Sequence, residues 1–197
     1  MPLQGQNNKP TIDHEKFGKI TYVSHNQLVF LESEDFTPLK LFFEPVIISL
    51  NYIDENYHFD SKDMIGISGG GWTTVLVSAI VPRIQHSFSI AGSYPLFLRD
   101  EVSDIGDYEQ INPLLYEKAN YLELYILAST GDSRKHSQIF IKNDPCCFGG
   151  NEYMVYEEYL MNTVNDLGGK YEIIIDKTTK KHEISEYILE KISDSLS

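Results

Sequence analysis

The chain has 197 residues, 42% of them hydrophobic and 12% aromatic, which suits one folded domain over residues 1–197 and excludes a disordered chain. Its formal net charge of −13 at pH 7 opposes binding to a phosphate backbone, so we expect no nucleic-acid partner. No apolar run approaches the roughly 18 residues of a membrane span, and residues 1–10 lack the apolar core of a signal peptide. We therefore expect a cytoplasmic protein with no membrane partner.

The amino-terminal third contains few strong signals. Residues 1–16 are polar and turn-rich, while residues 18–24 (GKITYVS) are compatible with a short strand or an extended loop. Residues 39–52 repeat apolar side chains at the three-to-four spacing of a buried helix. Within that helix, Pro45 is expected either to kink it or to mark its first turn.

Alternating strands and helices are predicted from residue 64 onward. Residues 64–67 form a short apolar strand, 73–82 a helix and 87–91 a second strand, and an irregular acidic stretch follows over 98–107. Near the carboxyl end, the predicted elements are a helix over 152–167 with a glycine stop, a strand over 171–175 and an amphipathic helix over 184–192. This alternation indicates the α/β class, with a mostly parallel, doubly wound sheet.

The middle of the chain allows two interpretations. Residues 111–127 have the length and periodicity of one or two short helices, but residues 121–127 (YLELYIL) also alternate like a strand. If they form a strand, Asp132 lies just beyond its carboxyl end. If they are helical, the strand is 138–142 (QIFIK), and Asp144 follows it.

The most informative stretch is Gly66-Ile67-Ser68-Gly69-Gly70, which fits the G-x-S-x-G pattern of a nucleophile elbow. In such an elbow the serine occupies a strained turn between a strand and a helix, and we expect side chains at Gly66 and Gly70 to clash with it. The Gly69 N–H lies in the first helical turn, where it is free to donate to an oxyanion.

Other interpretations of these glycines are weaker. A P-loop requires a lysine where this chain has Trp72, and the dinucleotide-binding pattern requires a glycine where it has Ser68. A glycine-rich turn without chemistry remains the simplest alternative.

The two cysteines, Cys146 and Cys147, are adjacent, which suits reduced thiols better than a structural disulfide, and a metal site would need further ligands. We expect no metal and no cofactor.

With the elbow, a late histidine and an acid between them, the chain resembles the α/β-hydrolase superfamily, nearest to its dienelactone-hydrolase-like and acetyl-xylan-esterase-like bacterial members. The resemblance covers most of the chain from residue 39 onward. It implies a catalytic triad in the chain order serine, acid, histidine, each at the carboxyl end of a strand. Ser68 would be the nucleophile and His182 the general base.

The resemblance favours Asp144 as the triad acid, because family members run from a helix like YLELYILAS through an arginine, here Arg134, into a strand and then the aspartate. Asp132, in Ser-Thr-Gly-Asp, matches a more general acid loop and stays as the alternative. His14, His25, His58, His86 and His136 are less well placed than His182 to act as the base.

One departure from the family concerns the amino terminus. Members usually carry several strands before the elbow, and a loop after the third strand supplies the second oxyanion donor. Residues 1–5 resemble the end of a family strand, so we expect an amino-terminally truncated hydrolase fold that lacks this donor.

The resemblance implies a serine hydrolase that cleaves a small-molecule carboxylic ester through an acyl-enzyme intermediate. The alternative is an inactive hydrolase-fold protein that serves in binding or as a scaffold. Neither the oligomeric state nor the identity of the ester follows from the sequence.

Overall fold

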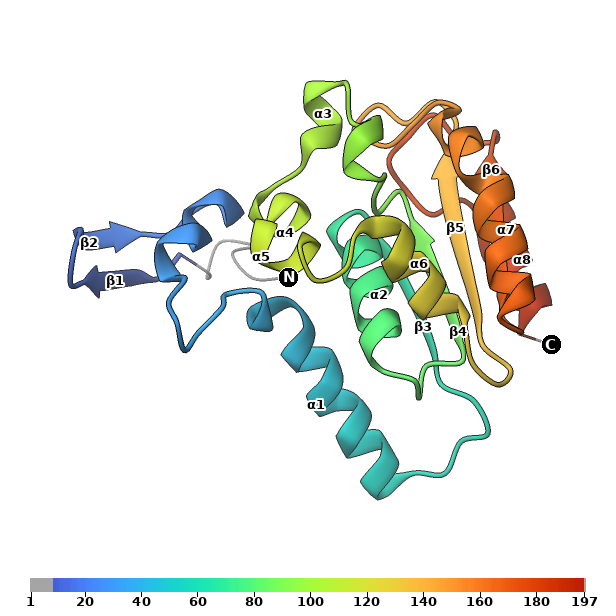
Figure 1. Cartoon of the computed structure of the whole chain (residues 1–197), viewed down its shortest axis with the longest axis horizontal. Helices are drawn as coiled ribbons and strands as arrows, with labels where there is room; N and C mark the ends of the chain where they lie inside the picture. The colour runs from blue at the N-terminus through green and yellow to red at the C-terminus, as the bar shows by residue number, and fades with distance from the viewer. Residues whose placement is uncertain (1–8, 197) are drawn as a thin grey trace.

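A four-stranded parallel sheet forms the centre of the protein, whose computed structural model describes residues 9–196. The strands lie in the order β3 (Asp63–Ile67), β4 (His86–Ile90), β5 (Lys135–Ile141) and β6 (Lys170–Asp176). Ile67 pairs with Ile90, which pairs with Ile139 of β5. Because all four strands are parallel, their carboxyl ends meet at one edge of the sheet, at the top of Figure 1.

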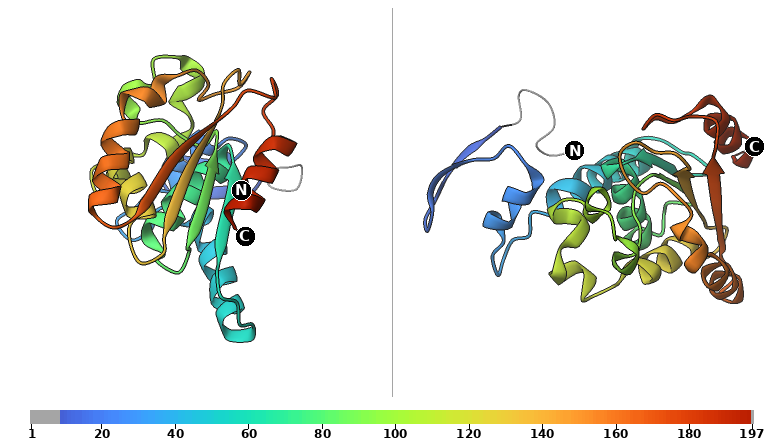
Figure 2. Two further views of the ribbon diagram at one scale, coloured as in Figure 1. Left: turned by 90° about the vertical axis from the view of Figure 1, so that its right-hand side faces the viewer. Right: turned by 90° about the horizontal axis from the view of Figure 1, so that it is seen from above.

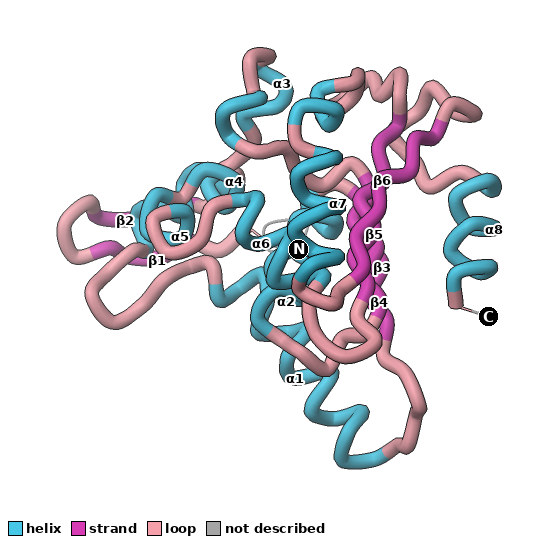
Figure 3. The backbone as a smooth tube through the Cα atoms, turned by 45° about the vertical axis from the view of Figure 1, so that its right-hand side comes forward, coloured by secondary structure: helices cyan, strands magenta, loops and turns pink. Residues whose placement is uncertain are grey.

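Helices cover both faces of the sheet (Figure 3). On one face lie α2 (Gly69–Ile80), α6 (Tyr121–Ser129) and α7 (Glu157–Asp166), and on the other lies α8 (Glu186–Ser195). The long helix α1 (Lys40–Asn56) packs against α2. The remaining helical segments are short: η1 (His25–Leu31), η2 (Leu96–Leu98), α3 (Val102–Ile105), α4 (Tyr108–Ile111), α5 (Pro113–Tyr116) and η3 (Glu152–Val155). The predicted parallel α/β architecture is confirmed.

Strand β4 shows why the sheet packs differently on its two faces. Phe88 and Ile90 project toward α8 and form a core cluster with Ile188 and Ile192. The intervening Ser89 faces α2 and donates its hydroxyl to the Gly71 carbonyl at 3.0 Å. The small serine therefore lets the helix that follows the elbow approach the sheet closely.

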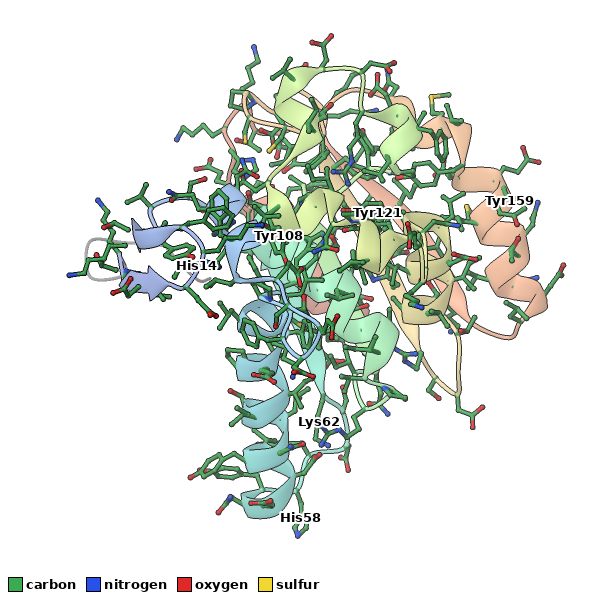
Figure 4. All side chains as sticks on the ribbon, turned by 60° about the vertical axis from the view of Figure 1, so that its left-hand side comes forward. His14, His58, Lys62, Tyr108, Tyr121 and Tyr159 are labelled. Carbon is green, nitrogen blue, oxygen red and sulfur yellow. The ribbon has the colours of Figure 1, made fainter. Side chains whose placement is uncertain are left out.

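The larger core cluster lies between the sheet and helices α2, α6 and α7. It is rich in aromatic residues, and Trp72 and Tyr121 are almost fully buried in it. Tyr121 points into this interior in Figure 4, which shows all described side chains. Trp72 donates its indole N–H to the Tyr116 hydroxyl at 2.9 Å, so the residue at the P-loop lysine position is part of the core.

The amino-terminal region contains a strand that the sequence did not indicate. β1 (Thr11–His14) pairs antiparallel with β2 (Gly18–Thr21), and the hairpin projects away from the sheet (Figure 2). The expected polar, turn-rich segment over residues 1–16 therefore includes a strand at residues 11–14, which the sequence did not indicate because a short exposed strand has no buried face to impose an apolar pattern. Residues 1–5 lie outside the described residues.

The ambiguous segment 121–127 is helical, as part of α6, and the strand of this region is β5. Asn120 caps α6 by accepting the N–H groups of Leu122 and Glu123, a local signal that favours the helix. Some details of the helices differ from expectation. Pro45 lies inside α1 rather than at its first turn, and the predicted helix 152–167 divides into η3 and α7.

Arg134, just before β5, connects the carboxyl ends of α2 and α6 with the loop before β4. Its buried guanidinium donates to the carbonyls of Ile84, Leu127 and Thr130 at 2.9–3.0 Å, and also to that of Ser78. It thus satisfies carbonyl groups near the carboxyl ends of α2 and α6 that helix geometry leaves unpaired.

No helix in the described part of the chain is both long and apolar enough to cross a membrane.

Candidate active site

Ser68 lies in the sharp turn between β3 and α2. Its backbone angles are φ 57° and ψ −126°, a conformation that non-glycine residues rarely adopt and that costs on the order of 1–3 kcal/mol. A hydrogen bond from its N–H to the Ile90 carbonyl, at 2.9 Å, fixes the turn against β4. The next residue, Gly69, is the first of α2, so its N–H has no acceptor within the helix. The local geometry is that of a nucleophile elbow.

The glycines around the serine have different tasks from those expected. A Cβ on Gly66 would lie 2.2 Å from the Gly70 carbonyl oxygen, so Gly66 must stay small, as predicted. A Cβ on Gly70 would meet nothing within 4 Å, and the expected clash there was wrong. The glycine of this helical turn that must stay small is Gly71, whose Cβ would come within 2.7 Å of the Ile90 carbonyl oxygen.

This difference predicts opposite outcomes for two alanine substitutions in one turn. We expect Gly66→Ala to lower the free energy of unfolding by about 1–3 kcal/mol, because the backbone of α2 has to shift. Gly70→Ala is the matched control and should change stability by about 1 kcal/mol or less, in the stabilising direction, since alanine favours helices over glycine. Urea unfolding of both variants measures the difference. Equal losses of stability would contradict this account of the turn.

His182 and Asp144 lie within hydrogen-bonding distance of each other near the same edge of the sheet. The His182 Nδ1 atom lies 2.8 Å from Asp144 Oδ2 and 3.1 Å from Oδ1. The Asp144 side chain is fully buried, and its Oδ1 also accepts the Cys146 N–H at 2.8 Å. The predicted contact between these two residues is confirmed. The other ring nitrogen, Nε2, is buried and has no hydrogen-bond partner among residues 9–196.

Asp132, the alternative acid, is distant from this pair. It is exposed in the turn between α6 and β5, at the amino end of the strand, whereas Asp144 follows the carboxyl end. The structure therefore brings His182 together with Asp144 and not with Asp132.

The loop that carries His182 is organised by Asp176, the last residue of β6. The Asp176 carboxylate is buried and accepts hydrogen bonds from the Thr178 N–H at 2.7 Å and from the Ser185 hydroxyl at 2.5 Å. Burial by itself raises the pKa of Asp176, but the hydrogen bonds from Ser185, Thr178 and Thr179 outweigh it, and the pKa is lowered below its usual value.

A pH dependence of stability follows from this lowered pKa. Stabilisation by Asp176 is present above the unfolded-state pKa of about 3.9 and is lost as the pH falls through the lower folded-state pKa. We expect Asp176→Asn to lose less unfolding free energy than the wild type as the pH is lowered from about 5 to about 2. Asp132→Asn, at an exposed carboxyl, is the control and should follow the wild-type profile. Identical profiles for the Asp176 variant and the wild type would refute the assignment.

A cavity of about 580 Å³ opens over Ser68. Its floor is the elbow, and its walls come from η1, from the segment after β4 and from the loop after β5. The lining residues are His25, Ile67, Ser68, Gly69, Gly70, Val102, Ser103, Gly106, Asp107, Glu109, Gln110, Cys146, Cys147 and Phe148. Its size is in the range of small-molecule sites.

One wall of this cavity is acidic. His25 Nδ1 lies 3.0 Å from Glu109 Oε1 and 3.5 Å from Asp107 Oδ2. Glu109 is only 3% exposed, and within the described chain its Oε2 atom has no hydrogen-bond partner. Sequence reasoning missed this wall and set His25 aside, because 84 residues separate His25 from Glu109 and no motif links them.

Cys146 and Cys147 also line the cavity, and both are free thiols. Their sulfur atoms and a ring nitrogen of His182 all lie within 4.8 Å of one another. The sequence spacing of 35 residues between Cys147 and His182 did not indicate this proximity.

Solved structures with similar folds include enzymes of several kinds. Est1E from Butyrivibrio proteoclasticus is 12% identical and matches over 88% of this chain and 79% of its own, with a TM-score of 0.55. The esterase Pf2001 from Pyrococcus furiosus is 13% identical over 82% of this chain and 61% of its own, with a TM-score of 0.54. The uncomplexed acylaminoacyl peptidase of Pyrococcus horikoshii is 18% identical over 76% of this chain, with a TM-score of 0.51.

The chain spans only about a quarter of the acylaminoacyl peptidase, 25% of its length. No protein-family model and no curated protein sequence matches the chain. At these identities the likeness concerns the fold alone.

Proposed function

The chain has the fold of the α/β-hydrolase superfamily, and from this premise we propose that it is a serine hydrolase that cleaves carboxylic esters. The observation that carries the proposal is the strained Ser68, exposed to a cavity at the sheet edge where the paired His182 and Asp144 also lie. Strained backbone conformations of this cost cluster at active sites, which supports a catalytic role for Ser68.

In the proposed reaction, His182 Nε2 removes the proton from the Ser68 hydroxyl as its oxygen attacks the ester carbonyl. Asp144 holds the proton on Nδ1 and stabilises the imidazolium that forms. The Gly69 N–H donates to the oxyanion. The imidazolium then gives its proton to the leaving alcohol, and a water molecule, activated by the same histidine, releases the acid and restores Ser68.

The proton transfer requires a contact that forms on substrate binding. Nε2 has no hydrogen-bond partner in the described part of the chain, so Ser68 and His182 are not yet hydrogen-bonded. Catalytic hydrogen bonds are often long in ligand-free enzymes and shorten in the complex. Because Nδ1 is already held by Asp144, the unpartnered Nε2 is the atom available to act as the base.

The acidic wall bears on which esters fit. Two carboxylates and one imidazole form this wall, and Glu109 Oε2 is a buried acceptor without a donor among residues 9–196. A substrate group that donates hydrogen bonds, such as a hydroxyl or an ammonium, would satisfy it, whereas an anionic group would be repelled. We therefore propose neutral or cationic small-molecule esters as the substrate class.

A binding or scaffold protein on the same fold is the second candidate. The observation that favours it is the missing hydrogen bond between Ser68 and His182. Covalent reactivity separates the two functions, because a binding protein does not need an activated serine.

We expect a fluorophosphonate probe to label the protein at Ser68, because the reagent reports a serine activated by a neighbouring base. Ser68→Ala should abolish the labelling. Ser103→Ala is the matched control, since Ser103 is an exposed serine in the same cavity, and it should still be labelled. Mass spectrometry of the labelled peptide locates the adduct. A wild-type protein that stays unlabelled would favour the binding function.

A further inference from the structure

The cluster of Cys146, Cys147 and His182 has a chemistry that ester hydrolysis does not use. Two thiols and an imidazole meet within 4.8 Å at the edge of the cavity. The His182 Nε2 atom is buried without a hydrogen-bond partner among the described residues, so its lone pair is free to bind a ligand.

These donors are those of a zinc site. Thiolate and imidazole together suit Zn²⁺, which prefers a tetrahedral arrangement with Zn–S distances of about 2.3 Å and Zn–N distances of about 2.0–2.1 Å. In such a tetrahedron two sulfur ligands lie about 3.8 Å apart. Because the two sulfur atoms already lie within 4.8 Å of each other, they need to approach by no more than about 1 Å, which an exposed cysteine in a loop can accommodate.

The surroundings of His182 support metal binding at Nε2. Histidine ligands of zinc commonly donate their other ring N–H to a carboxylate, which fixes the ring and raises its basicity. Asp144 provides that carboxylate, 2.8 Å from Nδ1. The same carboxylate accepts the Cys146 N–H at 2.8 Å, so it positions a thiol ligand and the histidine ligand together.

We propose that Cys146, Cys147 and His182 bind one zinc ion at the cavity edge, with the fourth position open to water. Both cysteines bind as thiolates and release their protons to solvent. A second consequence, which rests on the proposed function, is that the ion inhibits hydrolysis, because a coordinated Nε2 cannot accept the Ser68 proton.

Cobalt titration of the intact protein, with a phosphine reductant, tests the site without requiring any catalytic activity. We expect one Co²⁺ per chain, with visible ligand-field bands and a near-ultraviolet thiolate-to-cobalt absorption that Zn²⁺ abolishes by displacement. Cys146→Ser, Cys147→Ser and His182→Gln should each weaken binding at least about tenfold, and Asp144→Asn by about 10- to 100-fold.

His58→Gln is the matched control, since His58 is exposed at the far end of α1, away from the cluster (Figure 4). It should bind cobalt as the wild type does. A wild-type protein without thiolate-to-cobalt absorption, or cysteine variants that bind as tightly as the wild type, would overturn the proposed site.

Probe labelling of Ser68 with and without zinc tests the inhibition separately. We expect zinc to slow labelling of the wild type at least about tenfold, EDTA to restore it, and Cys146→Ser to lose this sensitivity. Cobalt binding with unchanged labelling would overturn the inhibitory role alone. A protein that binds cobalt but never reacts with the probe would count against the proposed hydrolase function and leave the metal site supported.

Discussion

Ser68→Ala and His182→Ala should each lower kcat for ester hydrolysis by a factor on the order of 10⁶ in an active form of the protein. In the proposed mechanism, serine and histidine act in one step, since the oxygen attacks only as the imidazole takes its proton, and either loss removes the whole step. Residual turnover should then come from binding and from the Gly69 N–H alone. Initial rates with a chromogenic ester, compared with the wild type, measure the effect.

The double variant is the decisive control for this pair. If the two residues act as a unit, as we propose, Ser68→Ala/His182→Ala should be no slower than either single variant. A double variant slower by the product of the single effects would mean that the residues act independently, and the triad assignment would be wrong. Ser103→Ala, elsewhere in the cavity, should retain turnover of the same order as the wild type.

Asp144→Asn should lower kcat by a factor on the order of 10⁴, the second-largest effect we expect. An amide in place of this carboxylate can donate to Nδ1, which would move the ring proton to Nε2 and leave the histidine unable to act as a base. In the proposed mechanism the buried carboxylate also stabilises the imidazolium, which a neutral amide would not do. KM should change much less than kcat, since the acid does not line the cavity.

Asp132→Asn is the matched control for the acid. Asp132 is exposed in a turn at the opposite end of β5, so its amide should leave turnover within about twofold of the wild type. Comparable losses from Asp132→Asn and Asp144→Asn would show that the pairing of Asp144 with His182 is structural rather than catalytic.

Local patterns in the sequence were sufficient for the elements that form the elbow and its partners. The strand before Ser68, the helix after it and the strand that precedes His182 were all predicted, because buried parallel strands are short apolar runs bounded by turn residues. Parallel strands place their carboxyl ends at one edge, so the triad acid and His182 were expected to meet there, and the resemblance to the α/β-hydrolase superfamily favoured Asp144 over Asp132 as that acid.

Other features depended on contacts between distant segments. Residues 121–127 fit both the helical and the strand periodicity. In the structure they form part of α6, which packs against α2. Gly66 and Gly70 are equivalent in the motif, but only the packing of α2 on the sheet distinguishes them. The acidic wall joins residues 84 positions apart.

The sequence by itself determined the class of fold and the identity of the elbow, because these depend on backbone conformation and on periodicity within a few residues. Only the tertiary structure decided what surrounds Ser68: the wall of His25, Asp107 and Glu109, and the thiols beside His182. Those side chains come from loops whose paths follow the packing of the elements they join, and no local periodicity encodes that path.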